Sequence, residues 1–473
     1  MKAHFIGGAW VEGTQAFETR NPSHTDEVVE AYALGGAAEV AVAVEAARAA
    51  APRWAAATPQ ARFNVLDAAG TEILARQAEL GRLLAREEGK TLPEALGEVA
   101  RAGQIFKFFA GEALRISGLR VDSVRPGVEV TTKLEPLGVV GLITPWNFPI
   151  AIPAWKTAPA LAFGNAVVLK PSEVAPGCAW ALAEILSRAG LPEGAFNLVL
   201  GDGAAGKALA EHPEVDGVSF TGSVAVGRSV AAACASRLAR CQLEMGGKNP
   251  LVVLDDADLD VAVNAAVQGA FFSTGQRCTA SSRLIVTPGI HDRFVAAMVE
   301  RLKGLKVGDA LDEGTHIGPA VDARQFRKDL DSIALAKAEG GRLAFGGEAL
   351  EGPGHFVAPT LFTGTDNAWR FNREEAFGPL AGVIRAGDFD EALALANDTD
   401  FGLVAGICTT SLKHAAAFQR HAQAGMVMVN LPTAGVDYHV PFGGRKGSSC
   451  GPREQGAAAR EFYTVTKTCY TMP

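Results

Sequence analysis

The chain has 473 residues, 48% of them hydrophobic and 20% charged, and a net charge of −8 at pH 7. This length predicts two or more domains with the composition of a soluble globular protein. The negative charge, without a dense run of Lys or Arg, argues against nucleic acid as a partner. Neither a signal-peptide core nor a run of 18 apolar residues occurs, and the seven scattered cysteines form no CxxC pair. We therefore expect a cytoplasmic protein with no membrane partner, no disulfide framework and no metal site.

The first part of the chain predicts mostly helices. After a short strand-like start, residues 37–117 place apolar residues three or four apart with charges between them, as amphipathic helices do. Within them, Gly89–Thr91 (GKT) resembles the end of a P-loop, but the upstream glycine is missing, so a helix end with a glycine cap is favoured. Residues 119–135 alternate apolar and polar side chains, as an exposed antiparallel ribbon would.

From Gly138 onward the pattern changes to short, nearly continuous apolar runs separated by helix-like segments. Buried strands that alternate with helices indicate βαβ units and a parallel sheet. A second alternating block follows Cys278 and reaches residue 430, with no internal repeat or obvious linker. The predicted fold class is therefore α/β, with closely packed domains.

Polar motifs follow three of the predicted strands. Thr144–Pro149 (TPWNFP) presents Asn147 from a proline-bracketed turn, Lys170–Glu173 (KPSE) follows the next strand, and Phe220–Ser223 (FTGS) opens a helix whose free N–H groups suit a phosphate. Ligands of α/β proteins bind at the carboxyl ends of strands. Taken alone, Asn147 is also a common turn former, and the lysine and glutamate also suit a solvated loop. Gly201–Gly206 (GDGAAG) matches GxGxxG but lacks the acid expected roughly 20 residues later, so we interpret it as a tight turn near a nucleotide.

Two residues could carry covalent and acid–base chemistry. Glu244 lies in an apolar, glycine-rich segment (LEMGGKN), and such surroundings raise the pKa of a carboxyl group toward that of a general base. Cys278 lies in a loop (STGQRCTA), where Arg277 could lower the pKa of the thiol only if its charge faces the sulfur. Each has a plainer alternative, namely an ion-paired structural glutamate and an inert loop thiol.

With EEAFGP (374–379), NDTDFGL (397–403) and PFGGRK (441–446), these motifs follow one another as in the aldehyde dehydrogenase superfamily, which the chain resembles over essentially its whole length. The resemblance implies a Rossmann-type cofactor domain, an α/β catalytic domain and a small β ribbon for oligomerisation. It assigns residues 1–117 and 137–245 to the NAD(P)-binding domain and 246–445 to the catalytic domain. Residues 118–136 and 446–473 become oligomerisation or bridging segments of a homodimer or homotetramer.

The resemblance also implies a mechanism that these residues can perform. Cys278 would attack the aldehyde carbon, and the side-chain amide of Asn147 and the backbone N–H of Cys278 would hold the oxyanion of the thiohemiacetal. Hydride would pass to a nicotinamide and leave a thioester, and Glu244 would activate the water that hydrolyses it.

Cofactor and substrate contacts follow from the same resemblance. Lys170 and Glu173 match contacts to the adenosine ribose, where a carboxylate favours NAD, with NADP still possible. Glu375 and Phe377 match a clamp on the nicotinamide ribose. The other cofactor contacts it implies are Thr144, Pro145, Trp146, Ser172, Gly203, Phe220, Gly222, Ser223 and Gly246. The substrate contacts it implies are Phe148, Arg277 and Phe442.

The end of the chain indicates a substrate. Many superfamily members continue with KxSGxGRE after PFGG, whereas this chain reads KGSSCGPREQG (446–456) and then EFYTVTKT. This variant is similar to bacterial 2-oxoglutarate semialdehyde (2,5-dioxopentanoate) dehydrogenases. We therefore expect 2-oxoglutarate semialdehyde to be oxidised to 2-oxoglutarate, with succinate semialdehyde or a simple aliphatic aldehyde as alternatives. Arg277, or another cation lining the aldehyde tunnel, is expected to pair with the distal carboxylate of the substrate.

Two further functions are disfavoured by the same residues. Release of the thioester to coenzyme A, instead of to water, is disfavoured by the presence of Glu244. A binding protein of the same fold that has lost catalysis is disfavoured because Cys278, Glu244 and Asn147 are all present.

Overall fold

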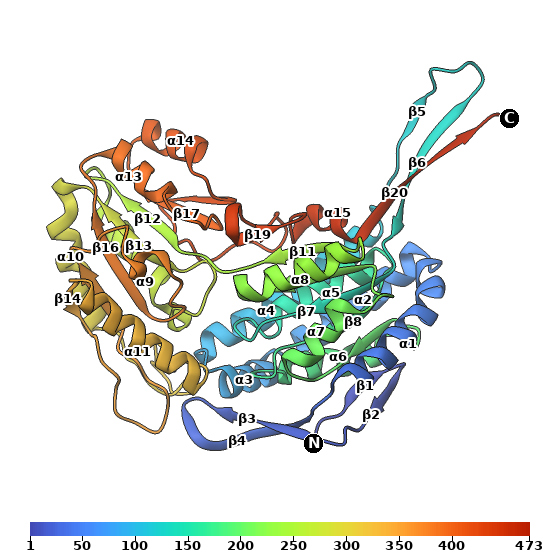
Figure 1. Cartoon of the computed structure of the whole chain (residues 1–473), viewed down its shortest axis with the longest axis horizontal. Helices are drawn as coiled ribbons and strands as arrows, with labels where there is room; N and C mark the ends of the chain where they lie inside the picture. The colour runs from blue at the N-terminus through green and yellow to red at the C-terminus, as the bar shows by residue number, and fades with distance from the viewer.

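The computed structural model describes residues 1–473 and contains two α/β units and a projecting ribbon (Figure 1). Each unit is built around one mostly parallel sheet, and a separate hairpin, β3 (Ala16–Asn21) with β4 (His24–Ala33), lies near the N-terminus. None of the helices combines the length and apolar composition that crossing a membrane requires. The α/β class and the alternation of strands with helices after residue 138 are confirmed.

The first sheet has eight strands and Rossmann-type winding. In spatial order they are β19 (Ser449–Cys450), β11 (Arg240–Glu244), β10 (Gly217–Thr221), β7 (Val139–Ile143), β8 (Ala166–Lys170), β9 (Phe196–Leu198), β1 (His4–Ile6) and β2 (Ala9–Val11). The five strands from β11 to β9 pair in parallel, while the outer strands are antiparallel. Strands β7, β8 and β10 are buried throughout, which explains why they are nearly continuous apolar runs in the sequence.

The order of these strands creates a binding crevice. The chain runs from β7 outward to β8 and β9, and then returns to place β10 on the other side of β7. At such a reversal, the connection that follows β7 and the connection that follows β10 run in opposite directions. A crevice therefore opens beyond the carboxyl ends of these two strands. The motifs at Thr144 and Gly222 therefore face each other across this crevice.

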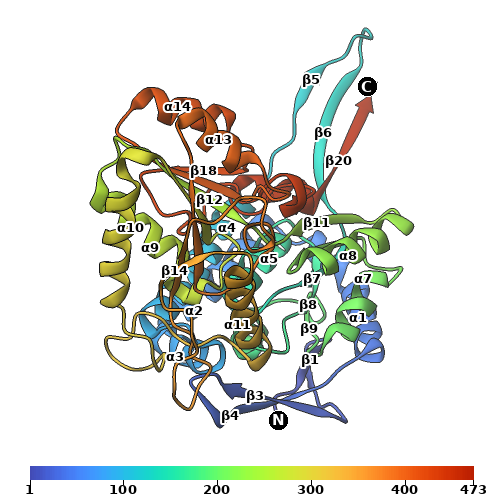
Figure 2. The ribbon, with the colours of Figure 1, turned by 60° about the vertical axis from the view of Figure 1, so that its left-hand side comes forward.

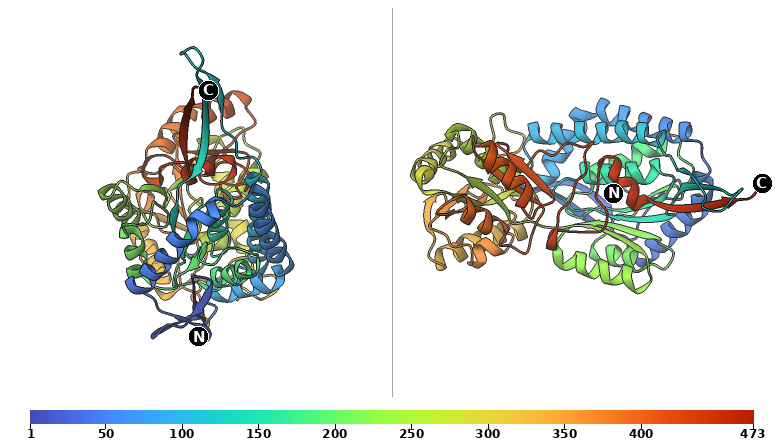
Figure 3. Two further views of the ribbon diagram at one scale, coloured as in Figure 1. Left: turned by 90° about the vertical axis from the view of Figure 1, so that its right-hand side faces the viewer. Right: turned by 90° about the horizontal axis from the view of Figure 1, so that it is seen from above.

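Helices cover both faces of the first sheet (Figure 3). The helices that share the larger apolar core on one face are α2 (Pro59–Ala75), α3 (Gln77–Glu88), α4 (Leu92–Ala113), α5 (Ala151–Ala162) and α6 (Gly177–Arg188). The other face is packed by α1 (Ala37–Ala55), α7 (Gly203–Glu211) and α8 (Val224–Ser236). The helices predicted between residues 37 and 117 are thus confirmed as α1 to α4.

The second sheet has seven strands, all parallel except β14 at one edge. In spatial order they are β14 (Arg342–Phe345), β15 (Thr360–Thr363), β16 (Leu380–Arg385), β13 (Ser281–Val286), β12 (Asn249–Val253), β17 (Val404–Cys408) and β18 (Met426–Val429). Its helices are α9 (Leu259–Ala270), α10 (Pro288–Lys303), α11 (Ala323–Ala338), α12 (Arg370–Arg373), α13 (Phe389–Asn397) and α14 (Leu412–His421). Glu244 ends the last strand before β12, and Cys278 precedes β13, so both lie where the two units meet.

Three antiparallel strands form the projecting ribbon (Figure 2). Its strands are β5 (Arg120–Asp122), β6 (Glu129–Pro136) and β20 (Thr464–Thr471), with β6 in the middle. The antiparallel ribbon expected over 119–135 is confirmed, and the C-terminal strand completes it. Within 446–473 only β20 belongs to the ribbon: β19 joins the first sheet, and α15 (Arg460–Tyr463) buries Phe462 and Tyr463 in the main core.

The sequence prediction for GDGAAG was wrong in its local structure. This stretch is not a free tight turn, because Asp202 caps α7 and its side chain accepts a hydrogen bond from the Ala204 N–H at 2.8 Å. The glycine at 203 is the first helical residue, and a Cβ there would have open space. By contrast, the glycine cap expected at Gly89 is confirmed, since that residue ends α3 with a φ of 90°.

Candidate active site

The crevice at the strand reversal is a cavity of about 630 Å³. It is bounded by the carboxyl ends of β7, β8 and β10 and by the first turns of α7 and α8. The residues from the cofactor prediction that line it are Thr144, Pro145, Trp146, Lys170, Ser172, Glu173, Gly203, Phe220, Gly222 and Ser223. The sequence motifs that are far apart in the chain thus meet in one cavity.

The polar groups of this cavity suit a dinucleotide. Ser223 caps α8, a helix of 13 residues, and lines the cavity. The free N–H groups at the start of this helix favour the binding of a phosphate. Lys170 Nζ lies 3.3 Å from Glu173 Oε2, an arrangement that can donate to and accept from ribose hydroxyls. The hydroxyl groups of Thr144 and Thr221 are buried and have no hydrogen-bond partner within the protein. Buried polar groups normally have partners, so these two fit a ligand that supplies them.

Three further predicted cofactor residues lie between this cavity and Cys278. Glu375 accepts a hydrogen bond from the Gly247 N–H at 2.8 Å, and a Cβ at Gly246 would come within 2.2 Å of the Glu375 carboxylate. Phe377 adopts a φ of 66° and its ring meets Trp146 edge-on, with centroids 5.4 Å apart. This close packing requires glycine at position 246. The Gly247 N–H holds the Glu375 carboxylate in a position near Cys278.

Cys278 lines a second cavity of about 330 Å³. The three predicted substrate contacts, Phe148, Arg277 and Phe442, line the same cavity. The loop before Cys278 contains the 3-10 turn η1 (Phe272–Gly275), in which Ser273, Thr274 and Gly275 all have positive φ values. A Cβ at Gly275 would come within 2.1 Å of the Gly378 carbonyl oxygen, so the tight loop depends on glycine at that position.

The thiol of Cys278 is held in its protonated form. Burial, followed by the nearby carboxyl groups of Glu375 and Glu244, raises its pKa to about 12. The carbonyl oxygen of Cys278 accepts a hydrogen bond from Asn249 Nδ2 at 2.8 Å, which fixes the backbone of the nucleophile loop. A thiol with this pKa is a weak nucleophile at neutral pH until a base removes its proton.

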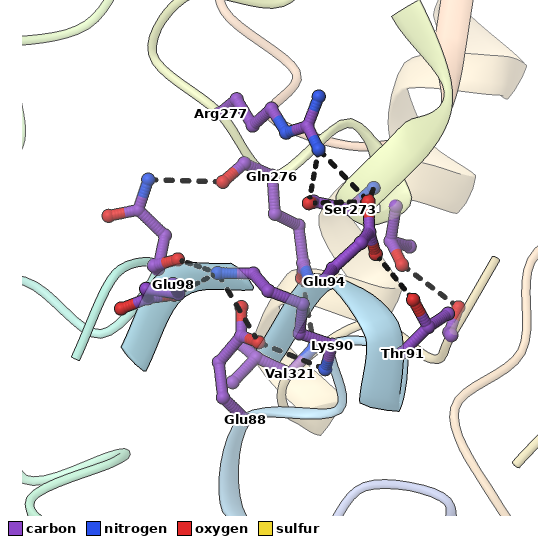
Figure 4. A network of polar contacts seen from close by, with 12 residues as sticks. Glu88, Lys90, Thr91, Glu94, Glu98, Ser273, Gln276, Arg277 and Val321 are labelled. Carbon is purple, nitrogen blue, oxygen red and sulfur yellow. Dashed lines mark hydrogen bonds and ion pairs between the residues drawn. The ribbon is translucent and has the colours of Figure 1, made fainter. Parts of the chain in front are cut away.

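Arg277 does not lower the pKa of this thiol, because its charge is directed elsewhere. Its Nη2 donates to Glu94 Oε1 at 2.9 Å and to Ser273 Oγ at 2.7 Å (Figure 4). Nη1 donates to the Gln268 carbonyl oxygen at 3.4 Å. The guanidinium therefore ties the nucleophile loop to α4 and α9.

Asn147 lies beside the nucleophile loop, in the turn that follows β7. It is buried, and its Nδ2 donates to the carbonyl oxygen of Gln276 at 3.0 Å. Its own carbonyl oxygen accepts from Lys90 Nζ at 2.7 Å, which fixes the turn from the other side. The side-chain amide is thus a fixed donor bound to Gln276, which lies two residues before Cys278 in the chain.

Glu244 is the last residue of β11 and is buried. Burial and the charge of Glu454 raise its pKa well above its usual range, while a hydrogen bond from Ser449 Oγ at 2.6 Å acts in the opposite direction. Ser449 reaches it because β19 pairs directly with β11. The raised pKa that the apolar sequence context suggests is therefore present, and Glu454, which is paired with Lys156, contributes to it.

Several site residues were missed by sequence reasoning. The sequence indicates only a helix end around Lys90, yet this side chain is buried, lines the Cys278 cavity and donates to Glu98 Oε2 at 2.6 Å. Glu94, Glu98 and Arg101 line the same cavity from one face of α4. Their spacing of four and three residues is the signal that could have identified a charged helix face.

A half-buried thiol, a buried carboxyl group and a rigid amide lie next to a dinucleotide-sized crevice, a combination that suits an oxidoreductase. The chain belongs to the aldehyde dehydrogenase family, whose model matches residues 10–469. An alpha-ketoglutarate semialdehyde dehydrogenase of Haloferax volcanii is 45% identical over 99% of this chain and 98% of that protein. An alpha-ketoglutaric semialdehyde dehydrogenase of Bacillus subtilis is 42% identical over 99% of this chain and 98% of that protein.

The fold agrees with that of solved members of this family. The crystal structure of a betaine aldehyde dehydrogenase from Staphylococcus aureus in complex with NAD+ superposes with a TM-score of 0.97. The two proteins are 34% identical, and the match covers 100% of this chain and 95% of that one. The cofactor and catalytic units expected from the sequence are thus those of an aldehyde dehydrogenase fold.

Proposed function

We propose that this protein oxidises 2-oxoglutarate semialdehyde to 2-oxoglutarate with NAD as the oxidant. The observation that carries the proposal is that the cavity holding Cys278 is lined by three basic side chains, Lys90, Arg101 and Arg277, against two carboxylates, Glu94 and Glu98, which leaves one basic side chain in excess. Such a cavity suits an aldehyde that carries a carboxylate. Similarity to the two semialdehyde dehydrogenases, over nearly the full length of each, supports the same substrate.

The chemistry begins at the thiol of Cys278. Its raised pKa means that a base has to remove the proton before the sulfur attacks the aldehyde carbon, and Glu244 is the buried carboxyl group we assign to this step. Attack gives a thiohemiacetal whose oxygen is negatively charged. We assign the Asn147 side-chain amide and the Cys278 N–H to this oxygen. After the thiol proton has passed from Glu244 to solvent, Glu244 takes a proton from a water molecule that attacks the thioester; the acid is released, and the departing thiolate takes the proton back from Glu244.

The nucleotide cavity fits NAD on the grounds of its own residues. When bound, NAD would supply the hydride acceptor that converts the thiohemiacetal on Cys278 into a thioester. Glu173 can accept hydrogen bonds from a ribose 2′-hydroxyl and would repel a 2′-phosphate, which supports NAD over NADP. The Staphylococcus aureus relative was solved with NAD+, which supports the same choice.

Replacing Asn147 by alanine is expected to lower kcat by about 10²- to 10³-fold, because one of two donors to the oxyanion is removed. The KM for the aldehyde should change much less, since the donor acts mainly on the charge of the intermediate. Steady-state kinetics of the purified variant measure both constants. A variant with unchanged kcat would contradict the role of the amide, and one with a changed KM alone would make Asn147 a substrate-binding residue.

Betaine aldehyde is the second candidate substrate, because the solved structure with a TM-score of 0.97 is a betaine aldehyde dehydrogenase. Aromatic side chains that could contact a trimethylammonium group do line the cavity, namely Phe148, Trp155 and Phe442. However, Arg101, the basic side chain in this cavity that has no ion-pair partner, would repel a cationic substrate. Values of kcat/KM for 2-oxoglutarate semialdehyde, succinate semialdehyde, butanal and betaine aldehyde decide between the candidates. Betaine aldehyde as the preferred substrate would contradict our proposal.

We also infer a homodimer or homotetramer assembled through the ribbon. Strands β5, β6 and β20 project from the main body and expose Val121 and Tyr470, and the connection between β5 and β6 exposes Val124. A projecting three-stranded sheet with open edges and apolar side chains is suited to pairing with another copy. A reducing, cytoplasmic location is supported by seven cysteines that are all free thiols.

A further inference from the structure

Two of the three basic side chains in the Cys278 cavity are already neutralised. Lys90 Nζ lies 2.6 Å from Glu98 Oε2, and Arg277 Nη2 lies 2.9 Å from Glu94 Oε1 (Figure 4). Glu98 is also bound on its other oxygen, which accepts hydrogen bonds from the N–H groups of Ile150 and Ala151 at 3.1 Å each. These carboxylates are fully engaged, so neither is available to a further cation.

A third carboxyl group near these pairs does not change the balance of charge. Glu88 Oε2 lies 4.0 Å from Lys90 Nζ, but burial raises the pKa of Glu88 to about 8. Burial thus disfavours its charged form, and Glu88 is not among the residues that line the cavity. The cavity consequently keeps one positive charge that no carboxylate of the protein neutralises, and that charge belongs to Arg101.

Arg101 has hydrogen-bond donors without acceptors. It lies on α4 one turn beyond Glu98, and its Nη2 donates to the neutral Gln455 Oε1 at 3.2 Å. Its Nε is buried without a partner, and Nη1 makes no hydrogen bond within the protein. Asp437 and Glu98 influence Arg101 only through their fields, since neither forms an ion pair with it. A guanidinium group taken out of water without a counter-charge is costly, and it would gain most from a carboxylate ligand.

A second orphaned donor points to the same ligand. The guanidinium carbon of Arg101 lies 5.8 Å from the centre of the Trp155 ring, and the indole Nε1 of Trp155 is also buried without an acceptor. Both side chains line the cavity that contains Cys278. Two unpaired donor side chains next to each other, with one excess positive charge, match an anion with two acceptor oxygens.

We propose that Arg101 is the residue that binds the distal carboxylate of the semialdehyde while the aldehyde carbon lies at Cys278. This inference rests on the proposed function and identifies its specificity determinant. The planar guanidinium binds the carboxylate side-on, through Nε–H and the second N–H of Nη2, whose first N–H donates to Gln455, and Trp155 Nε1 donates to the same carboxylate. Arg277 is a positioning residue, because its bonds to Glu94 and Ser273 hold the nucleophile loop. The unpaired charge of Arg101 also explains why a cationic aldehyde would be rejected.

The test is the substrate preference of an Arg101→Met variant. Its measure is kcat/KM for 2-oxoglutarate semialdehyde divided by kcat/KM for butanal, which lacks the carboxylate. We expect this ratio to fall by about 10- to 100-fold, the range that follows from losing a charged hydrogen bond. Arg101→Lys keeps the charge but not the forked geometry, so its ratio should lie between those of the parent and the methionine variant.

Two controls separate recognition from structural damage. Arg115→Met removes an exposed arginine just after the same helix and should leave the ratio unchanged. Arg277→Met should lower kcat/KM for both substrates equally, because it loosens the nucleophile loop. Glutarate binding, measured by calorimetry in the absence of turnover, should weaken at least about tenfold in Arg101→Met.

The outcomes distinguish this inference from the proposed function. A parent enzyme that prefers butanal would overturn both. A parent enzyme that prefers the semialdehyde, with an unchanged ratio and unchanged glutarate binding in Arg101→Met, would overturn the role of Arg101 alone. If Arg101→Met fails to fold, the lysine variant decides: a ratio and glutarate affinity equal to those of the parent would contradict bidentate binding, and intermediate values would support it.

Discussion

Replacing Cys278 by alanine is expected to lower the rate of aldehyde oxidation by at least about 10⁴-fold, because no covalent intermediate can form. The variant should retain its fold and its nucleotide binding, since the small side chain fits a site already shaped by its loop. Oxidation rates and NAD affinity of the purified variant measure the two effects separately. Cys469→Ser is the matched control, because that thiol lies in the ribbon strand β20, and its rate should equal that of the parent. Comparable rates for Cys278→Ala and the parent would contradict the mechanism.

The environment of Cys278 also predicts how its reactivity depends on pH. Its pKa is raised to about 12, chiefly by burial, so the thiolate fraction is small at neutral pH and grows as the pH rises. Alkylation by iodoacetamide in the absence of substrate and cofactor follows this fraction and should accelerate steadily toward alkaline pH. This dependence is the reason that a nearby base is needed for turnover at neutral pH.

Replacing Glu244 by glutamine should cause the second-largest effect, a loss of about 10²- to 10⁴-fold in kcat. The loss arises because the thioester would no longer be hydrolysed at a useful rate. If Glu244 acts only on water, mixing the variant with aldehyde and NAD should give a burst of one NADH per subunit, and mass spectrometry should find the acyl group on Cys278. If Glu244 also takes the thiol proton, the burst itself should be slow. A variant that turns over at the parent rate would contradict both roles.

The pH dependence of kcat gives an independent check of Glu244. Burial and Glu454 raise the pKa of its carboxyl group, so the ionised form that acts as a base becomes more abundant as the pH rises. Hydrolysis of the thioester should therefore accelerate from neutral to alkaline pH in the parent enzyme. In Glu244→Gln this acceleration should disappear, because the amide does not titrate.

The cofactor half of the site could be predicted from local sequence. The motifs at Thr144, Lys170 and Ser223 each follow a short apolar run, and the carboxyl ends of parallel strands must lie at one edge of their sheet. The strand β11 was not identified, although its last residue, Glu244, was, because the strand is short and exposed at its start. The prediction of a tight turn at GDGAAG was wrong because Asp202 caps a helix there, and this cap outweighs the preference of the glycines for a turn.

The charges of the aldehyde cavity could not be assigned from sequence in the same way. Arg277 is adjacent to the nucleophile in the chain, which suggested contact with the substrate, but its partner Glu94 lies 183 residues away on α4. Whether a cation is neutralised depends on such long-range packing, not on its neighbours in the sequence. The same packing leaves Arg101 unpaired, and it places Ser449 and Glu454 near Glu244. These relationships follow only from the three-dimensional packing of the chain.

The most direct measurement is the product of the reaction. Purified enzyme is incubated with 2-oxoglutarate semialdehyde and NAD, with and without coenzyme A, and the products are identified by mass spectrometry. We expect free 2-oxoglutarate and NADH in equal amounts under both conditions, because Glu244 directs the thioester to water. No NADH, or a coenzyme A thioester as the product, would contradict this expectation.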